Sequence, residues 1–195
     1  GGNYNVTVGD EAGTAITTGD RNVTIGFEAG TAISTGGSNI AIGYQALKTE
    51  DGHGLNVAIG EESLENLNAG ADGYNVAVGA SAGKNMTTGI QNTFVGGLAG
   101  DALTVGGNNV ALGHLALSAD TQGSSSVAVG MSALTAQNST SEANMYNVAV
   151  GRSAGASVTT GTENTLIGGL AGDAMTTGSY NTAVGKDSSG KVTTG

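Results

Sequence analysis

Asn56-Val57-Ala58-Ile59-Gly60 is one of eleven copies of a five-residue phrase that recurs through the 195-residue chain. Most copies read Asn, an apolar residue, a small residue, an apolar residue and Gly. Neighbouring copies begin 17 residues apart eight times, with one step of 19 after Asn56 and one of 21 after Ser126. A period this regular indicates one small unit stacked on itself, so we expect a rod built from repeats.

Each repeat has the composition of one β-coil. Apolar and small residues alternate within the phrase, as in a β-strand, and Gly ends the strand. A second turn follows, for example at Thr17-Thr18-Gly19. Two short strands and two turns use about 17 residues at ~3.3 Å per strand residue. The sequence therefore predicts an all-β fold, a parallel β-solenoid (β-roll) of eleven ~17-residue coils, forming a single array over residues 1–195.

The apolar positions outside the phrase predict a narrow core. Repeats with Gly eight residues after the leading Asn, such as Gly13, carry a large apolar residue three positions later, here Ile16. Repeats with Leu at the first of these positions, such as Leu47, mostly carry a polar residue at the second, here Glu50. We expect each coil to supply one large apolar group to a thin, close-packed core.

The leading Asn predicts a hydrogen-bonded ladder along the rod. Identical Asn side chains on successive coils can bond to one another and cap the strand edge. Ser126 replaces Asn in one repeat. The predicted ladder residues are Asn5, Asn22, Asn39, Asn56, Asn75, Asn92, Asn109, Asn147, Asn164 and Asn181.

The repeats also form blocks of four, which start near residues 5, 75 and 147. Both length insertions, around 66–74 and 137–146, fall in the fourth repeat of a block. We expect them to form loops on one edge of the rod, ~19 Å apart. Such loops are either binding loops or tolerated bulges. Because Gly2 and Gly195 share one repeat phase, we also expect the chain to be a segment of a longer fibre.

The middle strand residues form an uncharged series. We expect them to point away from the core, because successive strand residues point to opposite faces and we assign the two flanking residues to the core. An unbroken small or apolar stripe favours burial against other chains, and a homotrimer is the expected assembly, with a single-chain solenoid as the alternative. The stripe consists of Ala41, Ala58, Ala77, Phe94, Ala111, Ala128, Ala149, Leu166 and Ala183.

The residue that follows each phrase is the most variable position of the repeat. A receptor or glycan that binds the rod itself would contact this position, and the expected contacts are Phe27, Tyr44, His114 and Arg152. A free surface that tolerates any residue is the alternative.

Composition disfavours several classes of function. Six basic against 16 acidic residues give a net charge of −10, which disfavours nucleic acid and anionic membranes as partners. No apolar run approaches the ~18 residues of a membrane span. His53 and His114 occupy different repeat phases, and neither has a second His or Cys at ligand spacing. We expect no enzyme, no catalytic or metal-binding residues and no cofactor.

The phrase Asn-Val-Ala-Val-Gly with a following Ala-Gly or Ala-Leu resembles the head repeats of trimeric autotransporter adhesins of the YadA type. Strings such as Gly43-Tyr-Gln-Ala-Leu47 and Thr159-Thr-Gly161 are also similar to repeat arrays of phage tail fibres. The resemblance covers the whole chain. It implies a trimeric, parallel, left-handed β-roll that serves as a stalk or adhesive head.

These observations predict a structural or adhesive fibre segment, the shaft or head of a tail fibre or surface adhesin. It would space or present a receptor-binding tip for host attachment, outside the cell on a virion or cell surface. One alternative is a single-chain solenoid that polymerises end to end into an extracellular filament. Another is a solenoid face that binds glycan or, through Thr-Thr-Gly turns such as Thr87-Thr88-Gly89, ice.

Overall fold

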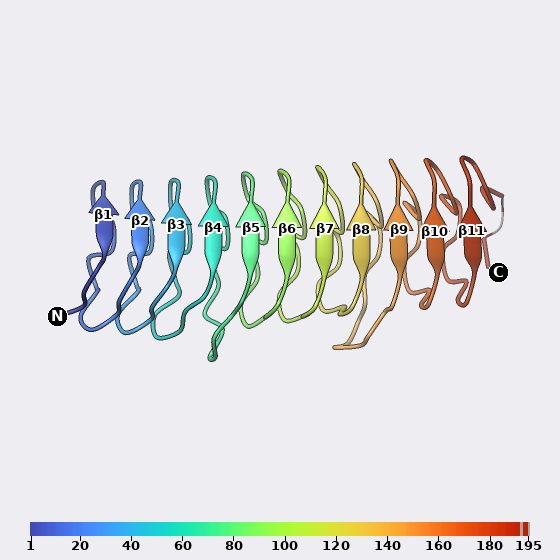
Figure 1. The fold of residues 1–195 in the computed structure, drawn as a ribbon. Coiled ribbons are helices and arrows are strands. Elements are labelled where there is room, and N and C mark those ends of the chain that lie inside the picture. The colour runs from blue at the N-terminus through green and yellow to red at the C-terminus, as the bar shows by residue number, and fades with distance from the viewer. Residues whose placement is uncertain (192, 195) are drawn as a thin grey trace.

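The computed structural model is a stack of coils, each of which contributes one three-residue strand (Figure 1). It describes residues 1–191, 193 and 194, so Gly195 lies outside the described residues. The strands are β1 (Val6–Val8), β2 (Val23–Ile25), β3 (Ile40–Ile42), β4 (Val57–Ile59), β5 (Val76–Val78), β6 (Thr93–Val95), β7 (Val110–Leu112), β8 (Val127–Val129), β9 (Val148–Val150), β10 (Thr165–Ile167) and β11 (Thr182–Val184). They form one 11-stranded parallel sheet in sequence order. The predicted all-β parallel solenoid with ~17-residue coils is confirmed.

Successive phrases pair in strict register, so that Ala58 lies opposite Ala41 on one side and Ala77 on the other. The part of the chain that the structure describes contains no helix, and therefore none long and apolar enough to cross a membrane. A second strand per coil was expected, but the described remainder of the coils consists of turns, bends and irregular backbone, with an isolated parallel bridge between Ser124 and Asn144.

The turns use left-handed backbone at fixed phases of the repeat. Gly60, at the end of its phrase, has a φ of +137°, and a Cβ placed there would lie 2.4 Å from the carbonyl oxygen of Gly79 in the next coil. No other residue fits so close to a neighbouring backbone. Non-glycine residues occupy three further phases, and Glu62, Leu64 and Tyr74 have φ values of +55°, +49° and +50°. Each costs roughly 1–2 kcal/mol of backbone strain, which packing must offset.

The middle residue of each strand points into the core, which corrects the predicted stripe. Ala41, Ala58, Ala77, Phe94, Ala111, Ala128, Ala149 and Leu166 have no exposed area and Ala183 has 3%. The proposed contact of these residues with another chain is therefore wrong. The prediction assigned the first and third residues of each strand to the core and the middle residue to the outside. The coil is too narrow for this, because residues from the opposite wall already fill the core, and a small middle residue is what fits.

The opposite wall follows the predicted compensation in most coils, although Leu64 and Leu67 of the β4 coil are both fully buried. Leu47, Leu64, Leu117 and Leu134 are fully buried, and so are Ile33, Met86, Leu103, Val158 and Met175, which accompany Gly in their own coils.

Large middle residues match glycines across the core. A Cβ at Gly83 would lie 2.9 Å from the Phe94 ring, and one at Gly100 would lie 2.8 Å from it. Leu166 relates in the same way to Gly155 and Gly172, at 2.8 Å from each. The second and third blocks therefore each contain a pair of glycine coils around one large strand residue, while Thr24 occupies this position between Gly13 and Gly30 in the first block. This pairing gives the later blocks a packing reason for their four-coil period.

The predicted Asn ladder is present. The Asn39 side chain accepts the Asn56 backbone N–H through Oδ1 at 3.1 Å and donates through Nδ2 to the carbonyl of His53 at 3.0 Å. Most ladder residues repeat this pattern and are completely buried. At Ser126, whose side chain is shorter, the buried Gln137 amide lies between Ser126 and Asn147 and bonds to both.

The ladder is weakest where the insertions occur. Asn75 N–H donates to Asn56 Oδ1 at 3.3 Å, the longest such bond. Among the described residues, the Asn147 N–H has no ladder acceptor, because Ser126 precedes it. The insertions therefore coincide with the two weaker steps of the ladder.

Candidate functional site

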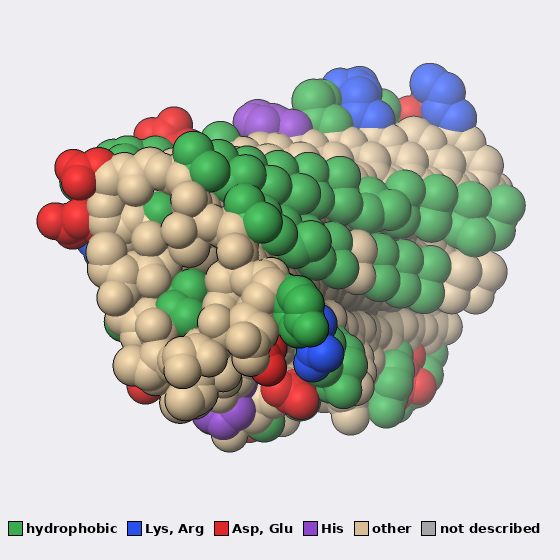
Figure 2. All heavy atoms as spheres, turned by 60° about the vertical axis from the view of Figure 1, so that its left-hand side comes forward, with side chains coloured by type: hydrophobic (Ala, Val, Ile, Leu, Met, Phe, Trp, Pro, Cys, Tyr) green, Lys and Arg blue, Asp and Glu red, His purple; other side chains and the backbone are tan. Residues whose placement is uncertain are grey.

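The outward side of the sheet carries an aliphatic face, formed by the first and third residues of β1 to β11. All are Val, Ile or Leu except Thr93, Thr165 and Thr182, and none is charged. Most are half-buried, because neighbours in the same row cover one another, while Val95 and Ile167 are 40% exposed. Figure 2 shows hydrophobic side chains in parallel rows along the molecule, with charged and histidine side chains beside them.

The aliphatic face is large for an isolated chain. Eleven strands ~4.8 Å apart and side-chain rows ~7 Å apart give a surface about 50 Å long and roughly 10 Å wide. A mostly aliphatic area of roughly 500 Å² is as large as the biggest patches on ordinary monomers, which are often functional. Sequence reasoning missed this face because it assigned these side chains to the core.

The four predicted surface contacts are exposed, at the turn that follows the strand. Phe27 and Tyr44 come from adjacent coils, and their rings stack with centroids 5.5 Å apart at an interplanar angle of 13°. His114 and Arg152 lie on later coils of the same edge. The structure brings together Phe27 and Tyr44 only, so the four do not form one pocket.

Ion pairs link neighbouring coils beside this edge. Lys48 Nζ lies 2.5 Å from Glu28 Oε2, and Lys84 Nζ lies 2.7 Å from Glu62 Oε2. The hydrogen bond from Lys48 lowers the pKa of Glu28, and the one from Lys84 lowers the pKa of Glu62. Because these groups are well solvated, we assign them a role in solubility and coil registration rather than in chemistry.

Both insertion loops protrude from one edge, between β4 and β5 and between β8 and β9 (Figure 1), as predicted. A buried carboxylate anchors each loop. Glu50 Oε2 accepts the N–H of Ala69 at 3.1 Å, and Asp120 Oδ1 accepts the N–H of Ser139 at 3.2 Å. The polar residues that accompany Leu in these coils therefore hold the loops of the next coil.

The second turn of the β3 coil, at residues 50–53, brings together potential metal ligands that sequence reasoning considered only separately. Donor atoms of Glu50, Asp51 and His53 all lie within 4.8 Å of one another. The available signal was the replacement of the usual Thr-Thr-Gly turn by Asp51-Gly52-His53.

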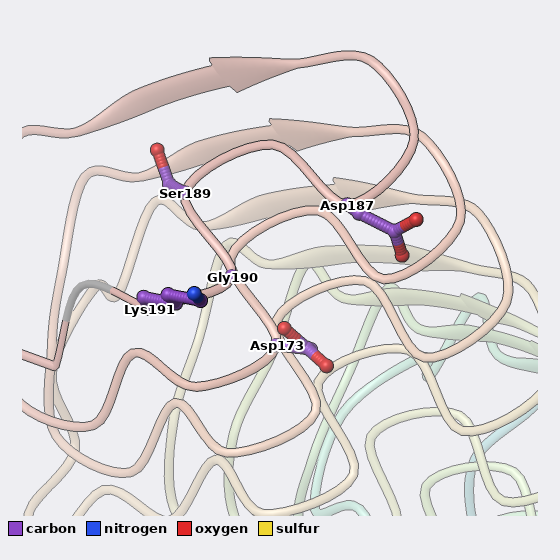
Figure 3. Close-up of a pocket in the computed structure, with 5 residues that line it drawn as sticks. All are labelled: Asp173, Asp187, Ser189, Gly190 and Lys191. Atoms are coloured by element: carbon purple, nitrogen blue, oxygen red, sulfur yellow. The ribbon is translucent and has the colours of Figure 1, made fainter.

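A cavity of about 460 Å³ lies at the last coil, lined by Asp173, Asp187, Ser189, Gly190 and Lys191 (Figure 3). It is a hollow at the end of the described stack, where the last coil is not covered by another. The Asp187 carboxylate contacts Lys186, so the two acids are not a free pair facing a substrate. We assign no site to this hollow.

The fold and these surfaces define the class of protein, a parallel β-solenoid repeat protein. No protein-family model matches the chain, and no curated protein or solved structure is significantly similar to it.

Proposed function

We propose that the chain is a structural, adhesive segment of an extracellular fibre on a virion or cell surface, assembled from three parallel copies. The aliphatic face carries this proposal. It replaces the middle-residue stripe as the surface through which copies meet, and the fibre spaces or presents a receptor-binding tip.

The first support is the cost of leaving this face in water. Burial of apolar surface is worth about 25 cal/mol per Å², so covering roughly 500 Å² on each copy stabilises an assembly by about 12 kcal/mol per chain before association costs. A monomer would retain an unusually long hydrophobic wall.

The second support is the uniformity of the face. Every coil presents the same two rows, and the strands lie in strict register from β1 to β11. Identical rods can therefore pack side by side over their whole length. The resemblance to trimeric adhesin heads favours three copies around an axis.

The Thr-Thr-Gly turns give less support to ice binding. Their first hydroxyl is already used, since Thr87 Oγ1 donates to the Thr104 carbonyl at 3.2 Å and Thr159 Oγ1 to the Thr176 carbonyl at 3.0 Å. These bonds hold successive coils together and use the donor hydrogen of each of these hydroxyls, which leaves it only as an acceptor toward water.

The test is the native mass of the chain and of a charged variant. One chain has a mass of 18.8 kDa, so light scattering after size exclusion should give about 56 kDa. Val110→Lys with Val127→Lys places two charges in the middle of the aliphatic face. We expect this variant to elute as a folded single chain with an unchanged circular dichroism spectrum.

Met131→Lys is the matched control, because Met131 is 45% exposed and lies on the turn edge of the β8 coil. It should leave the mass of the assembly unchanged. A monomeric wild-type chain, or a trimer that survives both Val substitutions, would contradict the proposal. A heavy species with a broad distribution of lengths would favour end-to-end filaments instead.

A further inference from the structure

We propose that Glu50, Asp51 and His53 form a binding site for one divalent transition-metal ion, with Zn²⁺ as the best match. This inference goes beyond the fibre proposal and does not depend on assembly, because all three ligands belong to one turn of one chain.

The local sequence departs from its repeat at all four positions of this turn, and three of the four replacements are potential ligands. The equivalent turn of another coil reads Met86-Thr-Thr-Gly89, with the Met in the core. Here Glu50 replaces the core residue, Asp51 replaces the first Thr and His53 replaces the Gly. Imidazole and carboxylate groups together are a donor set that Zn²⁺ accepts.

Glu50 is a buried carboxylate with few donors. Its side chain has no exposed area, and it accepts two backbone N–H groups, from His53 at 3.2 Å and from Ala69 at 3.1 Å. The equivalent Asp120 accepts three backbone N–H groups and the Gln137 amide. Leu67 occupies the position of Gln137 in the first block. Glu50 therefore keeps acceptor capacity in a place where a buried charge needs a partner.

The imidazole of His53 provides the second observation. Its Nδ1 atom is buried and has no hydrogen-bond partner, although 35% of the side chain is exposed. Nδ1 lies 3.6 Å from Glu50 Oε1, which is too long for a hydrogen bond. Two ligand atoms bound to one tetrahedral Zn²⁺ at ~2.1 Å are about 3.4 Å apart. The pair is thus spaced as two ligands of one ion.

Asp51 completes the set from the solvent side. It is exposed, and a carboxylate oxygen lies within 4.8 Å of the other two donor atoms. Two carboxylates balance the charge of a divalent ion, and the open side leaves a fourth position for water.

The site lies at the base of the first insertion loop, because Glu50 also holds Ala69. Bound metal would fix the turn from which this loop is anchored. The second insertion has no counterpart, since Thr121 and Gly123 replace the two other ligands. We therefore expect one ion per chain and not two.

The experiment uses the whole chain, stripped of metal with EDTA and dialysed into chelator-free buffer at pH 7.5. Zn²⁺ is titrated by calorimetry, and Co²⁺ is titrated by visible absorption, which reports inner-sphere tetrahedral ligands. We expect saturation at one ion per chain. His53→Gln and Asp51→Asn should each weaken Zn²⁺ binding at least ten-fold. Both side chains reach the surface, so both variants should stay folded.

His114→Gln is the matched control, since His114 is the other histidine and is exposed on a turn. It should bind Zn²⁺ as the wild type does. Absence of saturable binding would overturn the proposal. Equal weakening by His114→Gln and His53→Gln, or none by either, would also overturn it by showing adventitious binding.

Discussion

Replacing Phe94 by Ala tests two features together: that the middle residue of each strand faces the core, and that the core is closely packed. Phe94 has no exposed area, so its removal loses the burial of a whole ring and leaves a cavity between two coils. Such substitutions cost about 3–5 kcal/mol. Val95 is the next residue on the outward side and is 40% exposed. Val95→Ala should cost about 1 kcal/mol in the isolated chain.

A second substitution should compensate for the first. Gly100 has a φ of +59°, and a Cβ there lies 2.8 Å from the Phe94 ring. Gly100→Leu alone should cost roughly 3 kcal/mol, from overpacking and backbone strain. Combined with Phe94→Ala, it recreates the pairing of Ala41 with Leu47, whose φ is +49°. We expect the double variant to be about 2–3 kcal/mol more stable than the sum of the single losses.

The assay is urea unfolding followed by circular dichroism, at several protein concentrations to separate folding from association. Because repeat arrays can unfold in steps, midpoints and slopes should both be compared. A larger loss of unfolding free energy for Val95→Ala than for Phe94→Ala at the lowest concentration would refute the observed orientation, in which the middle residue of each strand faces the core. Additive losses in the double variant would refute the complementary packing of ring and glycine.

Three further predictions concern single polar groups. Thr24→Val should raise the melting temperature by about 2–4 °C, because the buried Thr24 Oγ1 has no hydrogen-bond partner; an equal or lower value in calorimetry would contradict this. Asn92→Ala should cost roughly 2–4 kcal/mol, since it strands the N–H of Asn109 and the carbonyl of Gly106, and faster amide exchange at Asn109 would locate the loss. Burial raises the pKa of Asp101 above 3.8, so its contribution to stability falls as the pH rises from 3.8 through the raised pKa. Asp101→Asn should therefore raise the melting temperature at pH 7 but not at pH 3, and a gain at both pH values would refute the assignment.

The coil boundaries and the strands were predictable because the repeat is exact in length and Gly marks each strand end. Which face of the sheet is buried was not predictable, since alternation defines two faces without saying which one lies inside. The pairing of Phe94 with Gly83 and Gly100 decides it, because a ring fits only where the facing residues lack side chains. That reasoning needs the distance across the coil, which periodicity alone does not provide.

The surface was predicted in part. Phe27 and Tyr44 were placed correctly on an exposed turn. The aliphatic face was missed because the prediction exchanged the inner and outer faces of the sheet. The ligand cluster was missed because each histidine was compared only with other His and Cys residues. A buried Glu50 beside His53 becomes visible once the turn is folded, since burial is what leaves Nδ1 without a partner.

The uneven Asn ladder has a mechanical consequence. Hydrogen bonds between coils run along the rod, so an axial pull loads all contacts of one junction together, while successive junctions share the same force in series. The junction that withstands the smallest force breaks first. The step from β4 to β5 has the long Asn75–Asn56 hydrogen bond. At the step from β8 to β9 the Asn147 N–H has no ladder acceptor. Under tension the rod should part at these two steps into two pieces of four coils and one of three, each of which keeps its own packed core.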